Sequence, residues 1–162
     1  MLALANAQGL YLLDFLDRRG LPRKLQSLGE RLHVVMVPGT NAHLDVLDEQ
    51  LSRYFSGSSL TFDLPCIFTG SPWEQQVWRH LLTIPPGVTN SYSQMAAALG
   101  RPTASRSVGR ANGMNFLALL IPCHRVIAAD GSLCGYGGGL WRKQWLLEHE
   151  FRHAPSPKPQ SP

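Results

Sequence analysis

The stretch that decides the fold is SYSQMAAALGRPTASRSVGRANGMN, residues 91–115. It predicts a short helix from about Ser93 to Leu99, which Gly100 ends. After the turn through Arg101 and Pro102, a second helix is predicted over residues 103–113, with Thr103 as its N-cap. Two short helices around a tight turn have the outline of a helix-turn-helix, and a plain helical hairpin has the same outline.

The helix before this stretch has a well-marked start. Ser71-Pro72-Trp73-Glu74 fits a capping box, with proline at the first helical position and glutamate three residues after the cap. Apolar residues at helical spacing form one face, and the helix is expected to stop before Pro85. The residues of this face are Trp73, Val77, Trp78, Leu81 and Leu82.

A last helix is predicted over residues 140–149, beyond the deciding stretch. Trp141, Trp145 and Leu146 are expected to face inward from it. The residues that follow are rich in proline, so residues 154–162 are expected to be a disordered tail.

The first part of the chain mixes strand and helix patterns. Four regions are predicted: two short strands within residues 1–15, a helix over 21–32, an apolar strand over 32–37 and a helix over 42–55. The sequence therefore predicts a two-domain α/β protein. Its parts are a mixed α/β domain over residues 1–65, a linker over 66–70, a helical domain over 71–153 and the tail.

Charge is unevenly distributed along the chain, whose formal net charge is +4. Residues 1–63 carry 6 Lys or Arg and 7 Asp or Glu, whereas residues 75–129 contain no acidic residue. The arginines in this acid-free stretch are Arg79, Arg101, Arg106, Arg110 and Arg125. A polyanion would meet positive charge there without fixed repulsion. A buried core segment with a few solvated arginines is the alternative explanation.

Cysteine usage and hydropathy exclude several classes of protein. Cys66, Cys123 and Cys134 cannot all pair and lack the CxxC spacing of a zinc site, so reduced thiols in the cytoplasm are expected. No metal site is predicted, because His33 and His43 are expected to be surface or loop residues. No apolar run approaches the length of a membrane span, and no signal peptide pattern opens the chain.

The most unusual local feature is the Cys123-His124-Arg125 sequence, which follows an apolar run over residues 116–121. A cysteine beside histidine and arginine sits in an electropositive setting, which lowers a thiol pKa. Neighbouring residues of an extended chain point to opposite faces, so His124 needs a bridging water or a kink at Pro122 to act on Cys123. Taken alone, the pair is better explained as a buried structural cysteine next to a coincidental histidine.

The wider sequence resembles a known family. Pro122-Cys123-His124-Arg125-Val126 matches the active-site signature of the O6-alkylguanine-DNA alkyltransferases, also called methylated-DNA–protein-cysteine methyltransferases. Four further segments resemble that family in its order and spacing: residues 91–94, 106–115, 135–140 and 143–150. The match covers residues 71–150 closely and the first domain loosely. It implies a small ribonuclease-H-like α/β N-terminal domain and a helical winged helix-turn-helix C-terminal domain for DNA binding and catalysis.

The resemblance also implies a reaction. Cys123 would be the nucleophile and irreversible acceptor of the alkyl group of O6-alkylguanine, and each molecule would act once. His124 would act through a water as base, and Glu150 would orient its imidazole. Tyr92 would donate a proton toward N3 of the departing guanine. No cofactor is expected, because the damaged base supplies the alkyl group.

Further residues have implied supporting roles. Asn115 would brace the hinge between the helix-turn-helix and the active-site strand. The base pocket would use the carbonyls of Cys123 and Val126 and the loop around Tyr136 and Gly137.

The implied partner is double-stranded DNA containing alkylated guanine, bound by a monomer. The recognition helix would enter the minor groove, with Arg106 filling the space left by a flipped nucleotide. Ala104 and Ser105 would permit close approach, and Arg110 and Tyr92 would also contact DNA. The sequence leaves open the range of alkyl sizes, the repair of O4-alkylthymine and a role for Cys134.

The chain departs from the family pattern at several positions. Phe116 stands where many relatives have proline, Ser105 and Ser107 where alanines are frequent, and Gly137 where serine is frequent. The family's first strand usually precedes a segment like residues 1–5. We therefore expect either a truncated form that lacks this strand or a unit that resembles the repair half of the bifunctional adaptive-response regulators.

Three other functions compete with repair. A non-catalytic damage sensor would bind alkylated DNA, although family members of that kind lack the cysteine that this chain has at position 123. A sequence-specific regulator would need base-reading side chains where the recognition helix carries small residues. A cysteine hydrolase would need better geometry than adjacent cysteine and histidine provide.

Overall fold

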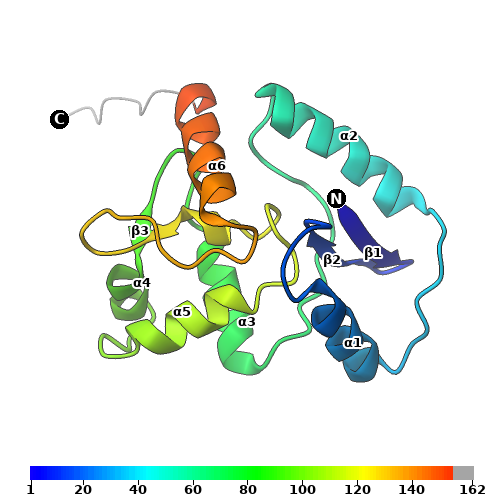
Figure 1. Ribbon diagram of the computed structural model, residues 1–162, viewed down its shortest axis with the longest axis horizontal. Coiled ribbons are helices and arrows are strands. Elements are labelled where there is room, and N and C mark those ends of the chain that lie inside the picture. The colour runs from blue at the N-terminus through cyan, green and yellow to red at the C-terminus, as the bar shows by residue number, and fades with distance from the viewer. Residues whose placement is uncertain (155–162) are drawn as a thin grey trace.

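The computed structural model describes residues 1–154, so the predicted tail beyond Ala154 lies outside the described residues. Those residues form an α/β structure in which β1, β2, α1 and α2 lie to one side of α3–α6 (Figure 1). The elements are β1 (Leu2–Asn6), β2 (Gly9–Asp14), α1 (Leu21–Leu32), α2 (Ala42–Ser56), α3 (Pro72–Leu81), β3 (Asn90–Ser91), α4 (Tyr92–Ala98), α5 (Ser105–Gly113), the 3-10 helix η1 (Cys123–Arg125), β4 (Val126–Ile127) and α6 (Leu140–His153). Within this range no helix is long and apolar enough to cross a bilayer.

The predicted N-terminal strands form an antiparallel hairpin, which confirms that expectation. Leu2 pairs with Asp14, and the register shifts between Leu4 and Ala5. All six residues of β2 are buried, because β2 also pairs on its other side with two distant segments. Leu10 bridges to Cys66 and Leu13 to Leu117, both in parallel. The hairpin is thereby tied to the segment that leads to Cys123.

The apolar strand predicted over residues 32–37 is wrong. Helix α1 runs through Leu32, and His33 ends it in a left-handed conformation with φ 52°. Val34 donates its N–H back to Gly29, and Val35 is 88% exposed. No strand of the described chain pairs with this segment, so the apolar residues follow a helix end instead of a sheet.

Helix α3 begins where the sequence places it. Glu74 accepts the Ser71 N–H at 2.7 Å and its own N–H reaches Ser71 Oγ at 3.4 Å, which completes the predicted capping box. The inward face is confirmed for Val77, Trp78 and Leu81, whereas Leu82 is 51% exposed.

Helices α4 and α5 follow the predicted pattern with shifted boundaries. Gly100 adopts a φ of 72° after α4, and its N–H donates to Ala97, as a helix-ending glycine does. The prediction of Thr103 as the next N-cap is wrong. A turn closed by the Ala104 N–H on Arg101 delays the helix, so α5 starts at Ser105 with Ala104 as an N-cap that makes no side-chain bond.

Helix α6 is longer than predicted and its tryptophans do not face inward. Leu146 is buried, but Trp141 is 65% and Trp145 39% exposed. Arg142 stacks over the Trp141 ring and also over Phe15, at 4.3 Å from each centroid. The tryptophans cover charged and aromatic neighbours at the surface instead of filling the core.

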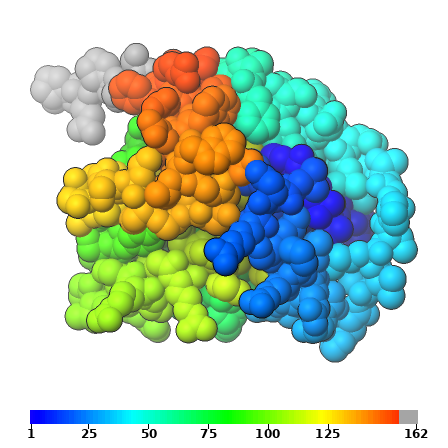
Figure 2. Space-filling model, viewed as in Figure 1, coloured from blue at the N-terminus to red at the C-terminus, as the bar shows by residue number. Residues whose placement is uncertain are grey.

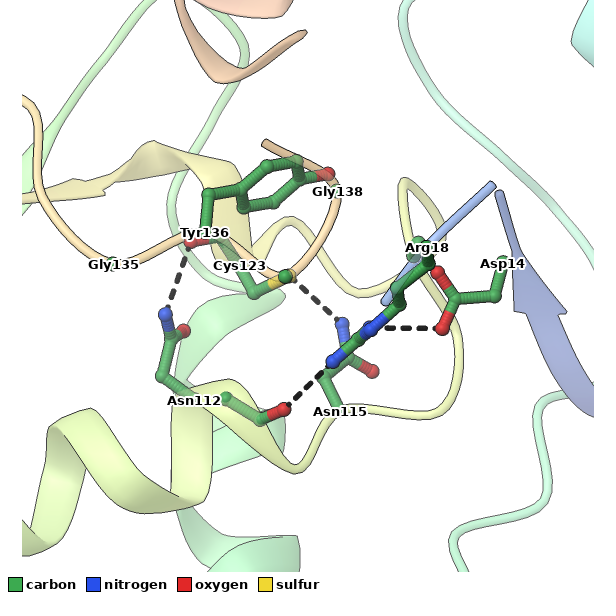
Figure 3. A pocket seen from close by; sticks show the side chains of 11 residues that line it. Asp14, Arg18, Asn112, Asn115, Cys123, Gly135, Tyr136 and Gly138 are labelled. Carbon is green, nitrogen blue, oxygen red and sulfur yellow. Dashed lines mark hydrogen bonds and ion pairs between the residues drawn. The ribbon is translucent and has the colours of Figure 1, made fainter. Parts of the chain in front are cut away.

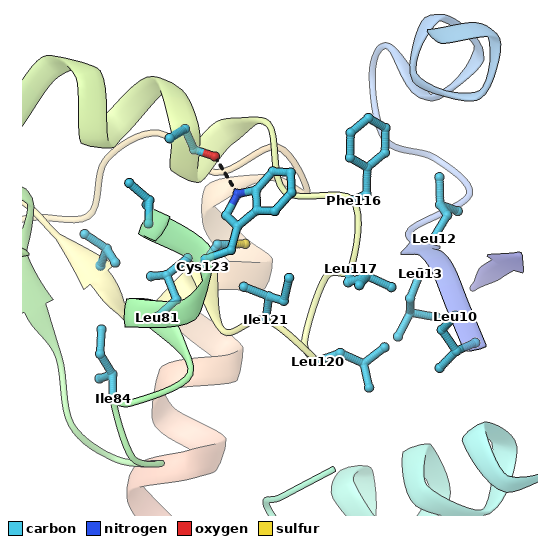
Figure 4. Close-up of a cluster of buried hydrophobic side chains, with 14 of the residues drawn as sticks. Leu10, Leu12, Leu13, Leu81, Ile84, Phe116, Leu117, Leu120, Ile121 and Cys123 are labelled. Carbon is cyan, nitrogen blue, oxygen red and sulfur yellow. Dashed lines mark hydrogen bonds between the residues drawn. The ribbon is translucent and has the colours of Figure 1, made fainter. Parts of the chain in front are cut away.

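The main core runs continuously from the hairpin to the cysteine. Phe116, Leu117 and Leu120 lie between the leucines of β2 on one side and Ile121, Leu81 and Cys123 on the other (Figure 4). The space-filling view shows the N-terminal residues packed directly against α6 (Figure 2). An ion pair of 2.8 Å between Arg142 and Asp17 joins these parts at the surface. The segment that bears Cys123 is therefore held from both sides.

Candidate active site

Asn115 organises the chain that approaches Cys123. Its Oδ1 accepts the Leu117 N–H at 2.8 Å, and its Nδ2 donates to the Ile121 carbonyl at 2.9 Å and to Cys123 Sγ at 3.1 Å. Within the turn that it spans, Leu119 has a φ of 69°, a conformation that costs energy for a residue with a side chain. The buried amide supplies the bonds that hold this turn, and it fixes the position of the thiol.

The Cys123 thiol is buried at the first position of η1. Burial raises its pKa above the ordinary value, although the Asn115 hydrogen bond and the charges of Lys24 and Arg18 act in the opposite direction. The sequence predicted a lowered pKa from the neighbouring His124 and Arg125. That prediction is wrong in direction, because Cys123 is desolvated. The thiol therefore needs a base to form thiolate at neutral pH.

His124 and Glu150 form a buried pair. His124 Nε2 and Glu150 Oε1 are 2.8 Å apart, and both side chains are fully buried. Burial lowers the His124 pKa, which favours a neutral imidazole. Burial alone would raise the Glu150 pKa, but hydrogen bonds from His124 and Arg125 outweigh it and lower the pKa to about 2. With Nε2–H donating to the carboxylate, Nδ1 is left as an acceptor, and it has no hydrogen-bond partner among residues 1–154.

Arg125 is a structural partner of this pair. Its Nε and Nη2 donate to the two oxygens of Glu150 at 2.8 and 2.9 Å, and Nη1 donates to the Ile84 carbonyl. Arg125 is buried, so the expectation that it offers free positive charge to a polyanion is wrong. Its charge is neutralised by Glu150.

Strands β3 and β4 bring Tyr92 to the same region. Asn90 pairs in parallel with Val126 and Ser91 with Ile127, which sets the start of α4 beside the end of η1. A second capping box, Ser91 with Gln94, fixes that start. Burial raises the pKa of Tyr92 to about 12, and Cys134 adds to the effect. The phenol therefore stays protonated near neutral pH and is able to donate.

A small pocket opens at Cys123. Figure 3 shows Cys123 between Asn115 and Tyr136, with Arg18 reaching toward them from the N-terminal side. The pocket is lined by Asp14, Arg18, Asn112, Gly113, Asn115, Ala118, Cys123, Gly135, Tyr136, Gly137 and Gly138. Its free space is about that of one water molecule. The predicted pocket residues Tyr136 and Gly137 line it, whereas Val126 does not.

The wall of the pocket is held by residues that the sequence did not single out. Arg18 donates to Asp14 at 2.8 Å and to the Gly113 carbonyl at 3.2 Å, and a Cβ at Gly137 would overlap its guanidinium. Asn112 donates to the Cys123 carbonyl at 3.2 Å. Buried Lys143 donates to the carbonyls of Val126 and Cys134, at 2.5 and 2.7 Å.

Only some of these residues lie in segments whose importance the sequence indicated. Asn112 and Lys143 lie in the segments that resemble the family, but nothing marked their contacts. Asp14, Arg18 and Lys24 come from the first part of the chain, where the resemblance is loose. Lys24 donates to Asp14 and to the Asn115 carbonyl, at 2.6 and 2.5 Å. Lys24 and Asn115 are 91 positions apart, and Arg18 and Gly113 are 95 apart, so sequence patterns do not reveal these contacts.

Four of the five predicted DNA-contacting residues lie on or next to α5, whereas the fifth, Tyr92, is the first residue of α4. Arg106 and Arg110 are exposed, and Ala104 and Ser105 are partly exposed at the start of the helix. Arg101 is also exposed, but its guanidinium lies over the Trp73 ring, 4.7 Å from the ring centroid. Within residues 1–154, no cluster of three or more His, Cys, Asp or Glu side chains is placed to hold a metal ion.

Comparisons with known proteins place this arrangement among its relatives. The family described as "6-O-methylguanine DNA methyltransferase, DNA binding domain" matches residues 72–152. A methylated-DNA–protein-cysteine methyltransferase of Mycolicibacterium paratuberculosis is 53% identical over 108 residues, 67% of this chain and 66% of that protein. The protein of the same name from Mycobacterium bovis is 45% identical over 134 residues, 83% of this chain and 81% of that protein.

Solved structures agree with the sequence matches. The OGT protein of Mycobacterium tuberculosis, crystallised in complex with DNA, has a TM-score of 0.79 and 40% identity, covering 95% of this chain and 88% of that one. The O6-methylguanine-DNA methyltransferase of Pyrococcus kodakaraensis has a TM-score of 0.65 and 26% identity, covering 91% and 88%. The likeness extends over the first part of the chain, beyond the matched family region.

Proposed function

The chain belongs to the methylated-DNA–protein-cysteine methyltransferase family, and we propose that it repairs DNA by moving the alkyl group of O6-alkylguanine onto Cys123. The observation that carries this proposal is the buried Cys123 thiol, which lines a pocket and adjoins a His124–Glu150 pair with 2.8 Å between Nε2 and Oε1. The chain also has the family's cysteine, which a non-catalytic sensor would lack.

The first step is proton removal from the thiol. Because burial raises the Cys123 pKa, we propose that a water carries the thiol proton to Nδ1 of His124, the buried nitrogen without a partner. Glu150, ionised and hydrogen-bonded to Nε2, then stabilises the imidazolium. The relay makes direct contact between the two adjacent side chains unnecessary. The expectation that they lie in an extended chain is wrong, because Cys123 and His124 belong to the 3-10 helix η1.

The second step is alkyl transfer. The thiolate attacks the alkyl carbon, an S–C bond forms, and the bond from that carbon to O6 breaks with its electrons left on guanine. Tyr92 donates its proton toward N3 of the leaving base, and solvent restores the phenol proton. The product is a thioether, which nothing in the reaction reverses, so each chain is used once.

In this proposal, α5 is the helix that contacts DNA. We propose that α4, the turn at Gly100 and α5 are a helix-turn-helix whose second helix enters the minor groove. Exposed Arg106 would fill the gap left by the flipped nucleotide, and Arg110 would neutralise phosphate. Because the pocket has room for about one water, base entry requires Arg18 or the loop over residues 135–138 to move.

The proposal also includes the domain organisation, the oligomeric state and the compartment in which the protein acts. We propose a ribonuclease-H-like domain over residues 1–65, a linker over 66–70 and a winged helix-turn-helix domain over 71–153. We also propose that the protein acts as a monomer. A reduced Cys123 is required, and all three cysteines are free, which supports action in the cytoplasm.

The test is the stoichiometry of repair. With duplex DNA containing O6-methylguanine in excess, we expect repaired guanine to reach a plateau near one per protein chain. A damage sensor would bind the duplex and repair nothing. Continued turnover past the plateau would indicate a hydrolytic or recycling enzyme and would contradict the proposal.

A further inference from the structure

The Glu150 carboxylate is reached from a part of the chain remote from the active-site segments. Tyr54 of α2 donates its Oη–H to Glu150 Oε1 at 2.8 Å, across 96 positions of sequence. Both side chains have no exposed surface. From the sequence, Tyr54 is expected only to lie in the helix predicted over residues 42–55, and the reaction described above gives it no role.

Tyr54 is rigidly held. Its ring stacks on Phe62 with centroids 5.3 Å apart and meets Phe55 edge-on at 5.5 Å. Its carbonyl accepts a hydrogen bond of 2.7 Å from His149 Nε2, the residue next to Glu150. The hydroxyl is thus aimed by packing and by α6 itself. A rigid donor fixes the acceptor more sharply than a mobile one.

Glu150 has its bonding capacity filled. Oε1 accepts from Tyr54, His124 and Arg125, and Oε2 accepts from Arg125 and, at 3.4 Å, from the Gly87 N–H. A carboxylate offers about four lone-pair sites, so each donor limits its rotation. Of these donors, Tyr54 alone comes from the first 65 residues.

We propose that Tyr54 is a positioning residue for the reaction at Cys123: its hydroxyl holds Glu150 so that the carboxylate keeps the His124 imidazole oriented with Nδ1 free. This inference rests on the proposed alkyl transfer. It makes α2 part of the catalytic arrangement, so the N-terminal part of the chain acts on the rate as well as on the fold.

The charges around this pair set the direction of the pH effect. Three groups face His124 and Glu150, namely Arg125, Tyr54 and Lys143. The His149 ring packs against the Tyr54 ring. Burial and Glu150 raise the Tyr54 pKa, so it stays a neutral donor. Loss of its hydrogen bond leaves more negative charge on Glu150, which stabilises imidazolium and raises the His124 pKa. Neutral His124, the form that acts as base, then predominates only above a higher pH than in the parent protein.

The experiment compares Tyr54→Phe with Tyr11→Phe in single-turnover methyl transfer from O6-methylguanine duplex over a range of pH. Tyr11 is a buried tyrosine whose hydroxyl, among residues 1–154, bonds only to Asn6 and Gln8 in the N-terminal hairpin region, so it is a matched control. For Tyr54→Phe we expect a rate about tenfold lower near neutral pH, because the charged carboxylate loses a hydrogen bond that fixes its orientation. The acid limb of the pH–rate profile should move to higher pH, and the final number of methyl groups transferred per chain should be unchanged. Tyr11→Phe should match the parent protein.

A double-mutant cycle separates positioning from structure. In a Glu150→Gln background the carboxylate charge is absent, so adding Tyr54→Phe should change the rate and pH profile far less than it does in the parent. Equal losses in both backgrounds, an unmoved acid limb, or a Tyr54→Phe chain that fails to fold would each overturn the inference in favour of a structural role. If the parent protein itself transfers no methyl group, the proposed function fails instead.

Discussion

At the scale of single residues, the site is built from buried polar groups that restrain one thiol. Asn115 bonds both the turn and Cys123 Sγ, and Glu150 collects donors from His124 and Arg125. Buried polar groups of this kind are stabilising only when their partners are present. Reactivity therefore depends on the geometry of these bonds more than on the proximity of positive charge.

Asn115 provides a direct test of this view. Asn115→Ala removes a hydrogen bond that lowers the Cys123 pKa, so the thiol pKa should rise further. We expect methyl transfer to be slower by about tenfold at neutral pH, the scale of one bond to a charged sulfur, and to recover partly as pH increases. The measurement is the single-turnover rate against pH.

Asn6→Ala is the matched control for this prediction, because Asn6 bonds Tyr11 in the hairpin, away from Cys123. It should leave the profile unchanged. A loss in Asn115→Ala that is the same at every pH would show that Asn115 acts only on the fold of the turn.

At the scale of elements, sequence patterns predicted what local chemistry determines. The capping box at Ser71 and the helix end at Gly100 both occur where they were expected, because each depends on a few adjacent residues. The strand over residues 32–37 was wrong, because a strand needs a partner and none is paired there within the described chain. Cys123, His124 and Glu150 were named from the sequence, whereas Tyr54 and Arg18 were missed, because their contacts form only after folding.

The proposed role of α5 in base flipping is testable by substitution of Arg106. Arg106→Ala should slow methyl transfer from duplex DNA by about tenfold or more, because rotating a base out of the stack costs a few kcal/mol. The same variant should react almost normally with the free base O6-methylguanine, which needs no flipping. Both rates are to be measured under single-turnover conditions.

Arg53→Ala is the control for α5, since Arg53 is exposed on α2 and pairs only loosely with Glu49 at 3.6 Å. Equal losses of Arg106→Ala on duplex and free base would argue against a role in base flipping. If Arg53→Ala slowed methyl transfer from duplex DNA as much, the effect would reflect general positive charge and not the position of Arg106.

At the scale of the whole molecule, the N-terminal part and the C-terminal part build one site. Lys24 and Arg18 bond to Asp14 and reach the Asn115 and Gly113 carbonyls, and Tyr54 reaches Glu150. The core is continuous from β2 to Cys123. Sequence resemblance was strong only over residues 71–150, so the contribution of the first part to the site became visible only in the folded chain.

The central claim is that Cys123 is the alkyl acceptor, and the most direct measurement is the mass of each cysteine peptide after reaction with O6-methylguanine duplex. We predict one added methyl group on the Cys123 peptide and none on the peptides of Cys66 and Cys134. Burial raises the Cys66 pKa to about 11, and Cys66 does not line the pocket at Cys123 or adjoin His124 in the sequence, so we expect it to stay a thiol. A methyl group on Cys66 or Cys134, or repaired DNA with Cys123 unmodified, would contradict the account.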